Sequence, residues 1–464
     1  MNRRHFFRNS SLALAGTGLI GPQPLFAASA QKAKNIIFLV SDGMSTGTLH
    51  MANLYCERTL GRSSHWIQLY KDRKASRGLM DTQSANSIVT DSAAGSSAFG
   101  GGFKVNNGSL NIHPDGRENM PIWQKFKKAG KKAGIVTSVT ATHATPAGFC
   151  VTSKSRNAEP EIAEKYLELG IDVVMGGGDE HFNAEHRKDK KDLYAAYAAK
   201  GYEVAKSRDE LQKISAKKPL LGIFSSGAIP YAIDRENDPE LKKTTPSLAE
   251  MAKSTIEVLS KHQNGFVLQI EGGKVDWAAH ANDIAGLIYD QLAFDEAIKV
   301  AIDFAEKDKN TLVIMTTDHG NANPGTISGG KASEGFDSIR NYKKTNEWLL
   351  NQITKDTTAS QIKDLIHATN GFAPTDEEIK SIKSYYDDIV RGEDGLYNYK
   401  KVPFKLYSEI QKKYNYIGWI SMSHSSDHVE VAAYGPGSEL LQPYCMNTDL
   451  HYLMLQAAEV PNSF

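Results

Sequence analysis

The amino-acid sequence predicts an α/β fold with a mostly parallel central sheet, helices on both faces and a helical insertion. Continuous apolar runs rich in Val, Ile and Leu alternate with helical patterns along the chain. Strands buried on both faces have this composition, and parallel strands need crossover connections that are usually helical. A third observation is a polar segment of 104 residues between His319 and His424 that contains no strong strand. We expect this segment to be mounted on the sheet as an insertion.

The predicted elements alternate through most of the chain. Strands are predicted at residues 35–40, 134–139, 172–175, 220–224, 266–270, 311–315 and 429–434. Helical patterns lie between them at residues 122–128, 159–169, 247–261 and 282–305. The insertion, at about residues 335–415, contains helical patterns at residues 360–368 and 375–388. We therefore predict one large domain over residues 31–464 that includes the insertion.

Composition and charge exclude several classes of protein. Of the 464 residues, 40% are hydrophobic and 23% are charged, as in ordinary globular chains and unlike disordered or fibrous ones. Lys+Arg and Asp+Glu are each 54, so there is no basic excess of the kind that a nucleic-acid-binding surface needs. The three cysteines form no CxxC pair, which argues against a disulfide framework or a zinc–thiolate site. Any metal ion must then be held by His, Asp and Glu.

Residues 1–30 have the pattern of an export signal. Arg3 and Arg4 precede a short, mildly apolar stretch, which ends in small residues suited to cleavage. The apolar stretch is too short to span a bilayer, and no cysteine follows it that could carry a lipid. The paired arginines indicate the twin-arginine pathway, with an ordinary secretory signal as the alternative. We expect a periplasmic or secreted protein without a stable membrane anchor.

Carboxylates and imidazoles follow three of the predicted strands. Asp42 follows the first strand, Glu271 follows the strand at residues 266–270, and Asp318 and His319 follow the strand at residues 311–315. Ligands bind beyond the carboxyl ends of such strands, so these side chains should meet at one edge of the sheet. Asp276 and His280 come four residues apart, which places them on one face of a helix where they can hold one ion. Mixed carboxylate and imidazole ligands suit zinc or a similar divalent ion.

A run of small residues around Ser92 indicates a helix start. The run is Thr90-Asp91-Ser92-Ala93-Ala94-Gly95. A serine in this position has its hydroxyl at the positive end of the helix dipole, where an alkoxide or a phosphate is favoured. A simple N-cap is the alternative for this serine. Because the GxSxG pattern is absent, a nucleophilic Ser92 would need a metal ion to activate it.

Taken together, the motifs resemble the alkaline phosphatase family. They occur in the family's order and span residues 35 to 437. The motifs are Ser41-Asp42-Gly43, Thr90-Asp91-Ser92-Ala93-Ala94, His143-Ala144-Thr145-Pro146-Ala147, Glu271 through His280, Thr317-Asp318-His319, and His424 with Tyr434-Gly435-Pro436. The resemblance implies hydrolysis of small phosphate monoesters through a phosphoserine on Ser92.

The resemblance also implies a site for two zinc ions and one magnesium ion. One zinc ion would be held by Asp276, His280 and His424, and the second by Asp42, Asp318 and His319, with Ser92 beside it. Magnesium would be held by Asp42, Thr145 and Glu271, and Arg156 would clamp the phosphate. At two positions this chain has residues that only some members share, His143 and Trp277, and we expect both near the third metal and the phosphate.

The identity of the last histidine ligand rests on spacing. His424 and His428 both precede the strand at residues 429–434. His424 lies ten residues before Tyr434, the interval at which the family places its final histidine, and it lies in a loop that can turn inward. We therefore predict that His424 binds the metal and that His428 does not.

Several other functions remain as alternatives. A phosphodiesterase, a sulfatase, a phosphomutase or another metal-dependent phosphoryl-transfer enzyme would share the fold. A sulfatase would need a CxPxR-like motif that is absent, and Arg156 and the Asp-Ser-Ala-Ala segment argue against the other enzymes. A non-catalytic periplasmic protein that binds phosphate or metal would have no use for a positioned nucleophile. The sequence leaves open the physiological substrate and whether the chain forms a homodimer.

Overall fold

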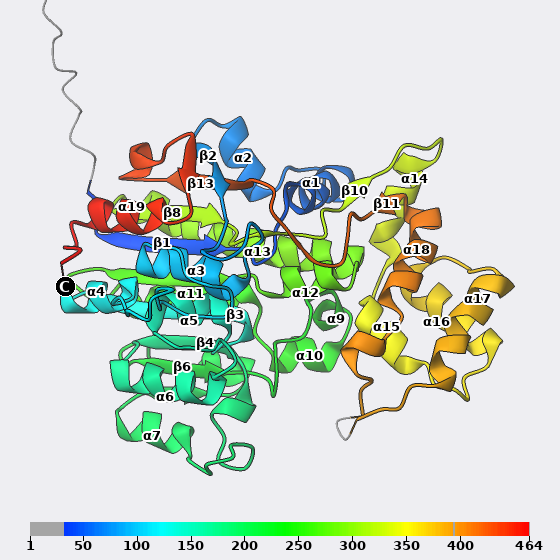
Figure 1. Ribbon diagram of the computed structural model, residues 1–464, viewed down its shortest axis with the longest axis horizontal. Helices are drawn as coiled ribbons and strands as arrows, with labels where there is room; N and C mark the ends of the chain where they lie inside the picture. Colours follow the sequence, from blue (N-terminus) through cyan, green and yellow to red (C-terminus); the bar gives the residue numbers. More distant parts are fainter. Residues whose placement is uncertain (1–31, 393–394, 464) are drawn as a thin grey trace, which may run out of the picture.

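A computed structural model describes residues 32–392 and 395–463 of the chain. The predicted export signal at residues 1–30 lies outside these residues. A ten-stranded sheet with the strand order β14-β2-β13-β8-β1-β7-β3-β4-β6-β5 forms the centre of the molecule (Figure 1). Its strands are β1 (Asn35–Val40), β2 (Ser76–Asp81), β3 (Lys132–Thr140), β4 (Val173–Gly177), β5 (Glu203–Ala205), β6 (Leu220–Ile223), β7 (Phe266–Glu271), β8 (Thr311–Thr316), β13 (Val429–Tyr434) and β14 (Tyr444–Met446).

The sheet is mostly parallel, as predicted. β1 lies between β7 and β8 and pairs with both in parallel, so that Val40 is aligned with Glu271 on one side and Thr316 on the other. Every residue of these three strands is buried. Burial on both faces explains why each strand is a continuous apolar run in the sequence.

Strand β13 is the exception to the parallel arrangement. It pairs antiparallel with both β8 and β2, with Tyr434 opposite Val313 and Ala432 opposite Met315. Because the strand is reversed, it begins at the edge of the sheet where β1, β7 and β8 end. Residues that precede β13 in the sequence are therefore delivered to that same edge.

Helices cover both faces of the sheet. Alternate residues of β1 contact different layers, because successive side chains of a strand point to opposite faces. Ile36, Phe38 and Val40 belong to one core, and Ile37 and Leu39 belong to the other. Helices of the first layer are α3 (Ser92–Gly101), α4 (Ile122–Lys128), α5 (Ala144–Cys150), α6 (Glu159–Leu169), α7 (Leu193–Ala199) and α19 (Asp449–Ala458). Those of the second are α1 (Thr46–Tyr55), α2 (His65–Lys71), α11 (Leu248–Leu259) and α13 (Ile284–Asp308).

The segment between His319 and His424 is mainly helical, as predicted. Its helices are α14 (Ala332–Asp337), α15 (Asn346–Gln352), α16 (Ala359–Asn370), α17 (Asp376–Lys383) and α18 (Phe404–Asn415). They lie together beyond one edge of the sheet (Figure 1). Capping boxes at Thr358 and Thr375 begin α16 and α17, which satisfies backbone N–H groups that would otherwise lack a partner. A third core joins these helices to α12 (Lys274–His280) and to the first turns of α13.

All three cysteines are buried free thiols. Burial raises the pKa of each one, to about 11 for Cys56 and about 12 for Cys445, and raises that of Cys150 as well. The thiolate, which is the reactive form, is therefore disfavoured.

Among the described helices, none has the length and apolar character needed to cross a bilayer.

Candidate active site

Three strand ends bring carboxylates together at one edge of the sheet. Asp42 follows β1, Glu271 is the last residue of β7, and Asp318 follows β8. The parallel register aligns the ends of these strands, and all three carboxylates are fully buried. The sequence predicted that these three carboxylates would lie close together, and the parallel register explains why they do.

Helix α12 adds Asp276 and His280. The two residues lie one helical turn apart, and Oδ2 of Asp276 is 3.3 Å from Nε2 of His280. Gly43 allows this helix to approach the end of β1, because a Cβ atom at Gly43 would lie 2.4 Å from Oδ1 of Asp276. Gly43 also has a φ of 69°, in the left-handed region that glycine adopts without strain.

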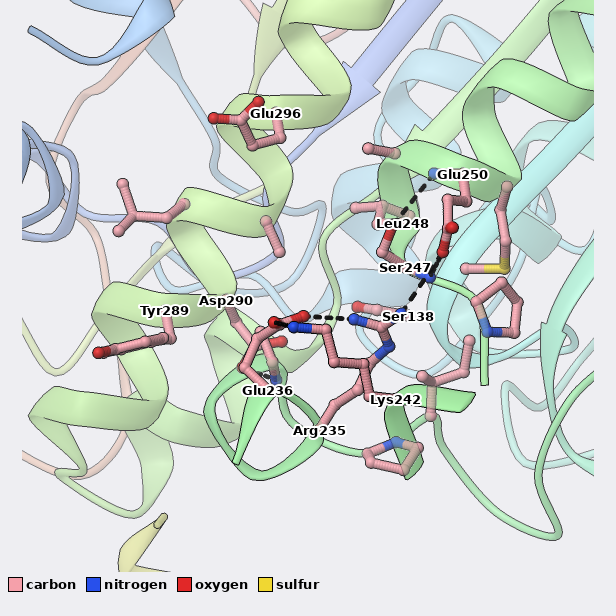
Figure 2. Close-up of a pocket in the computed structure, with 18 of the residues that line it drawn as sticks. Ser138, Arg235, Glu236, Lys242, Ser247, Leu248, Glu250, Tyr289, Asp290 and Glu296 are labelled. Atoms are coloured by element: carbon pink, nitrogen blue, oxygen red, sulfur yellow. Dashed lines mark hydrogen bonds and ion pairs between the residues drawn. The ribbon is translucent and has the colours of Figure 1, made fainter. Parts of the chain in front are cut away.

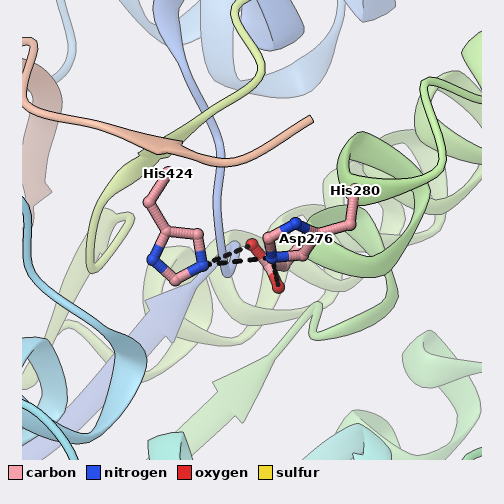
Figure 3. A group of neighbouring side chains, drawn as sticks. All are labelled: Asp276, His280 and His424. Carbon is pink, nitrogen blue, oxygen red and sulfur yellow. Dashed lines mark hydrogen bonds and ion pairs between the residues drawn. The ribbon is translucent and has the colours of Figure 1, made fainter. Parts of the chain in front are cut away.

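A short antiparallel pair of strands positions His424. In it, β12 (His424–Ser425) pairs with β9 (Gly320–Asn321), and His424 lies opposite Asn321. The imidazole ring of His424 stacks on that of His319, with ring centroids 3.7 Å apart. Its Nε2 lies 3.1 Å from Nε2 of His280 and 3.6 Å from Oδ1 of Asp276 (Figure 3).

His428 lies away from this group. Its side chain is exposed and packs edge-on against Tyr444 of β14. The structure thus brings His424, and not His428, to Asp276 and His280.

Asn321 belongs to the site but was not predicted from the sequence. Its side-chain amide donates to Oδ1 of Asp276 over 2.7 Å. The signal in the sequence was its position two residues after His319, on the continuation of a strand end that already carried ligand-type residues. An amide donor of this kind holds the carboxylate in one orientation.

Ser92 is the first residue of helix α3, as its small-residue setting suggested. Asp91 caps the helix by accepting from the backbone N–H of Ala94 over 2.9 Å. Oγ of Ser92 lies 3.3 Å from Nε2 of His319 and 3.5 Å from Oδ1 of Asp42. The hydroxyl is therefore at the positive end of the helix and beside two ligand-type side chains.

A further group surrounds Glu271. The hydroxyl of Thr145 donates to Oδ2 of Asp42 over 3.3 Å. Nδ1 of His143 lies 3.3 Å from Oε1 of Glu271 and 3.9 Å from Oδ2 of Asp42. Thr137, which sequence reasoning did not single out, donates to the other oxygen of Glu271. His143 therefore lies among the carboxylates of this group, with a ring nitrogen directed at them.

Arg156 reaches the site from the segment after α5. Its Nη1 donates to Oδ2 of Asp91 over 3.1 Å, and its Nη2 lies 3.2 Å from Nε2 of His143. These contacts place the guanidinium next to the N-terminus of α3, close to Ser92. Trp277 packs with the face of its ring against a cation, unlike the other predicted residues. The centroid of its ring lies 4.5 Å from the buried ammonium of Lys274.

The site holds more negative charge than the protein alone neutralises. Burial raises the pKa of Asp42 well above its usual value, and neighbouring Asp318 and Asp276 raise it further. Burial and the charge of Asp276 raise the pKa of Asp318 to about 6. Burial lowers the pKa of His319 well below its usual value, so its imidazole is neutral. Buried carboxylates with raised pKa values are a mark of functional sites.

Several features indicate that cations belong in the site. Three groups of side chains have ligand atoms within 4.8 Å of one another: Asp276, His280 and His424; Asp42, Asp276 and His319; and Asp42, His143 and Glu271. Nδ1 of each of His280 and His424 is within hydrogen-bond distance of a backbone carbonyl, so their Nε2 atoms face each other. Buried atoms of His143, Glu271 and Asp318 have no hydrogen-bond partner among the described residues. A metal ion between such atoms would satisfy them.

Another cavity, of about 500 Å³, lies between α11, α13 and the short helices α9 (Ala232–Glu236) and α10 (Pro239–Thr244). Figure 2 shows that Arg235 and Lys242, in its wall, are directed at Glu236. Lys242 binds Glu236 over 2.6 Å, and Arg235 binds both Glu236 and Glu250. None of the predicted site residues lines this cavity. The cavity is therefore a different site from the carboxylate and imidazole groups.

Comparison with known proteins agrees with this geometry. The family model described as alkaline phosphatase matches residues 33–460 of the chain. The chain belongs to the alkaline phosphatase family. Alkaline phosphatase 4 of Bacillus subtilis is 31% identical over 445 residues, which cover 94% of this chain and 91% of the relative. The alkaline phosphatase of Escherichia coli is 28% identical over 75% of this chain and 84% of its own length.

Solved structures give the same result for the fold. The crystal structure of Thermus thermophilus alkaline phosphatase matches with a TM-score of 0.85 and 34% identity, over 96% of each chain. The cold-active alkaline phosphatase of a Shewanella species matches with a TM-score of 0.76 and 25% identity, over 92% of this chain and 100% of the other. Membership of the alkaline phosphatase family makes this chain a metal-dependent hydrolase of phosphate monoesters, as the sequence motifs implied.

Proposed function

We propose that this alkaline phosphatase works through a phosphoserine on Ser92, at a site for two zinc ions and one magnesium ion. The observation that carries the proposal is the position of Ser92 Oγ. It lies 3.3 Å from Nε2 of His319 and 3.5 Å from Oδ1 of Asp42, at the start of α3. A hydroxyl in that position can be deprotonated and directed at a phosphorus atom.

One proposed set of metal ligands is the same as a group described above, and the other two overlap with the remaining groups. Asp318 takes the place of Asp276 beside Asp42 and His319, and Thr145 takes the place of His143 beside Asp42 and Glu271. Asp276, His280 and His424 would hold one zinc ion. Asp42, Asp318 and His319 would hold the other, since Nε2 of His319 is 3.4 Å from Asp42 and 3.5 Å from Asp318. The carboxylates of Asp42 and Glu271 with the hydroxyl of Thr145 offer the oxygen ligands that magnesium prefers. When bound, these ions supply positive charge that stabilises the attacking and leaving oxygens of an in-line displacement.

The residues of the chain carry out the displacement in two steps. In the first, Ser92 Oγ gives up its proton to solvent and forms a bond to phosphorus, while the bond from phosphorus to the leaving oxygen breaks and that oxygen takes up a proton from solvent to leave as an alcohol. In the second, a water oxygen attacks the phosphoserine, the bond from phosphorus to Ser92 Oγ breaks, and inorganic phosphate leaves. Helix α3 favours the negative charge on Ser92 Oγ in both steps, because Ser92 is the first residue of the helix and lies at the positive end of its dipole.

Arg156 is proposed to hold the phosphate during both steps. Its guanidinium presents parallel N–H donors that match two phosphate oxygens. The contacts with Asp91 and His143 fix its position in the absence of substrate. His143 and Trp277 are proposed to shape the surroundings of the phosphate and of the third metal.

Metal analysis combined with trapping of the intermediate tests the proposal. Purified enzyme should contain zinc and magnesium by mass spectrometry, lose activity toward 4-nitrophenyl phosphate on exhaustive chelation, and regain it with both ions. Acid quenching during turnover should leave a phosphorylated peptide that contains Ser92. Full activity in prolonged excess chelator, or a quenched enzyme without phosphate on Ser92, would contradict this mechanism.

We also propose that residues 31–464 form one catalytic domain, exported to the periplasm or secreted after a twin-arginine signal at residues 1–30. The motif Arg3-Arg4 and the short apolar stretch after it support this route. Replacement of both arginines by lysine should retain the enzyme in the cytoplasm, measured by activity in cell fractions. Unchanged export of the double variant would contradict the twin-arginine assignment.

A further inference from the structure

A groove in the insertion opens beside the active site. It has a volume of about 700 Å³, within the range of pockets that bind small molecules. We call it the insertion groove and define it by its lining residues: Ser384, Tyr385, Asp388, Ile389, Tyr399, Lys400, Lys401, Val402, Pro403, Phe404, Lys405, Leu406 and Met422. None of the residues assigned above to metals, phosphate or nucleophile lines it.

Two hydrogen bonds join the insertion groove to helix α12. Nδ1 of His280 lies 2.8 Å from the backbone oxygen of Met422, which lines the groove. The hydroxyl of Tyr399 donates to the backbone oxygen of Trp277 over 3.3 Å. Trp277 lies between Asp276 and His280 in the sequence, so one end of the groove abuts the helix that carries both residues.

The charge of the groove is positive. Lys400, Lys401 and Lys405 line it and are exposed, and no acidic partner is found for them among the residues that the structure describes. Among the described residues that line the groove, Asp388 is the one acidic residue. In a chain whose formal net charge is zero, three lysines with no acidic partner among the described residues give one groove a local preference for anions.

Aromatic rings also line the groove. Tyr385 is 48% exposed and Tyr399 is 39% exposed. Exposed tyrosine rings offer flat apolar surface on which another planar ring can stack. The combination of stacking surface with lysines suits an anionic ligand that contains a planar ring.

We propose that the insertion groove binds the leaving-group part of phosphate monoesters whose alcohol carries a planar ring and a second phosphate. A nucleoside bisphosphate has this chemistry: one phosphate would occupy the metal groups, the base would stack on tyrosine, and the other phosphate would meet the lysines. This inference rests on the proposed function, because it takes the metal groups as the place where the ester is hydrolysed. The insertion then acts as a specificity element of the enzyme.

The test compares two substrates in the metal-loaded enzyme. Adenosine 3′,5′-bisphosphate carries the ring and the second phosphate, whereas 4-nitrophenyl phosphate lacks the second phosphate. The variant Lys400→Gln/Lys401→Gln/Lys405→Gln neutralises the groove. Its matched control is Lys188→Gln/Lys253→Gln/Lys307→Gln, which removes three exposed lysines outside the groove. Phosphate release gives kcat/KM for each pair of enzyme and substrate.

We expect the groove variant to lose roughly tenfold in kcat/KM for the bisphosphate and less than about twofold for 4-nitrophenyl phosphate, since only the former places charge near the lysines. The wild-type preference for the bisphosphate should also shrink with added salt, because salt screens exposed charges. Tyr385→Leu should raise KM for the bisphosphate and for adenosine 5′-monophosphate, which has the ring alone.

Equal effects of the groove variant and the control variant on the bisphosphate would overturn the proposal. So would parallel losses on both substrates, which would show general damage to the enzyme. Acid quenching of the wild type during turnover of 4-nitrophenyl phosphate tests the proposed function by itself. Failure of the groove proposal would leave the phosphorylated Ser92 peptide intact, whereas failure of the proposed function would leave Ser92 without phosphate.

Discussion

Nε2 of His280 lies 3.1 Å from Nε2 of His424, although 144 positions separate the two residues in the chain. Each histidine has its Nδ1 at a backbone carbonyl, which leaves the two Nε2 atoms to face each other. Although burial opposes it, the charge of Asp276 raises the pKa of His280 to about 9, so a positive charge, a proton or a metal ion, is favoured between the two rings. This relationship is the most direct sign in the structure that the family's dependence on metal applies to these side chains.

The first prediction concerns the nucleophile. Ser92→Ala should lower kcat for 4-nitrophenyl phosphate by at least about a thousandfold, which corresponds to ~4 kcal/mol of transition-state stabilisation. The circular dichroism spectrum and the metal content should not change, because only one oxygen is removed. Ser97→Ala is the matched control, since the hydroxyl of Ser97 lies on the same helix but contacts Ser109 and Asn111. A Ser92→Ala enzyme that keeps more than about a tenth of its kcat, a loss of only ~1.4 kcal/mol, would rule out the assignment.

The second prediction concerns the phosphate clamp. Arg156→Ala should raise the inhibition constant of inorganic phosphate roughly 10- to 100-fold, the value of a charge-assisted hydrogen bond of about 1.5–3 kcal/mol. It should lower kcat less than Ser92→Ala does. Arg156→Lys should be intermediate, because an ammonium cannot hold two phosphate oxygens in one plane. An unchanged inhibition constant in Arg156→Ala would show that the guanidinium does not bind phosphate.

The third prediction separates the two candidate histidines. His424→Ala should lose one zinc ion per chain and most of its activity, because His424 lies with Asp276 and His280. His428→Ala should keep both, because its exposed ring contacts only Tyr444 among aromatic residues. Zinc content by mass spectrometry and kcat are the two measurements. Loss of zinc in His428→Ala but not in His424→Ala would reverse the ligand assignment.

The fourth prediction concerns pH and stability, and uses a histidine outside the active site. Burial, followed by the nearby Lys125, lowers the pKa of His451 to about 4. Its Nδ1 contacts the backbone oxygen of Phe99 at 3.0 Å, and Nζ of Lys125 lies 3.3 Å from its Nε2. The fold therefore holds the neutral imidazole.

The unfolded chain, in which His451 titrates near pH 6.5, binds one more proton than the folded chain between about pH 6.5 and 4. The contribution of His451 to the free energy of unfolding is thus complete above pH 6.5. It is lost as the pH falls toward 4, by up to about 3 kcal/mol. Urea unfolding at several pH values should show a smaller decline in His451→Gln than in the wild type. Exposed His50→Gln is the control, and identical slopes in all three proteins would refute the prediction.

The central part of the fold was readable from the sequence for a physical reason. Strands buried on both faces, such as β1 and β7, are continuous apolar runs, and parallel strands end at a common edge. The convergence of Asp42, Glu271 and Asp318 follows from those two facts. Strand β2, which lies between β14 and β13, was missed because Ser76–Asp81 is half exposed and contains charged residues, so it has no apolar run to detect.

Long-range geometry was harder to predict. The direction of β13 depends on its partners β8 and β2, which local periodicity does not encode. The role of Asn321 depends on its pairing with His424 across 102 intervening residues. Likewise, the contact of His143 with Glu271 requires that α5 and β7 be placed in space. Spacing within motifs identified the residue types, but only tertiary structure shows which atoms face one another.

The reversed strand β13 has a consequence for the order of events during synthesis. His424 reaches its neighbours only when β12 and β13 have paired, and both follow the insertion in the chain. A ribosome must therefore translate the whole insertion before the histidine pair can close. Before that point the carboxylates, His280 and His319 are present without His424, so a partly made chain would be exposed to weak or incorrect metal loading. Zinc bound between His280 and His424 would tie together segments that are synthesised far apart in time.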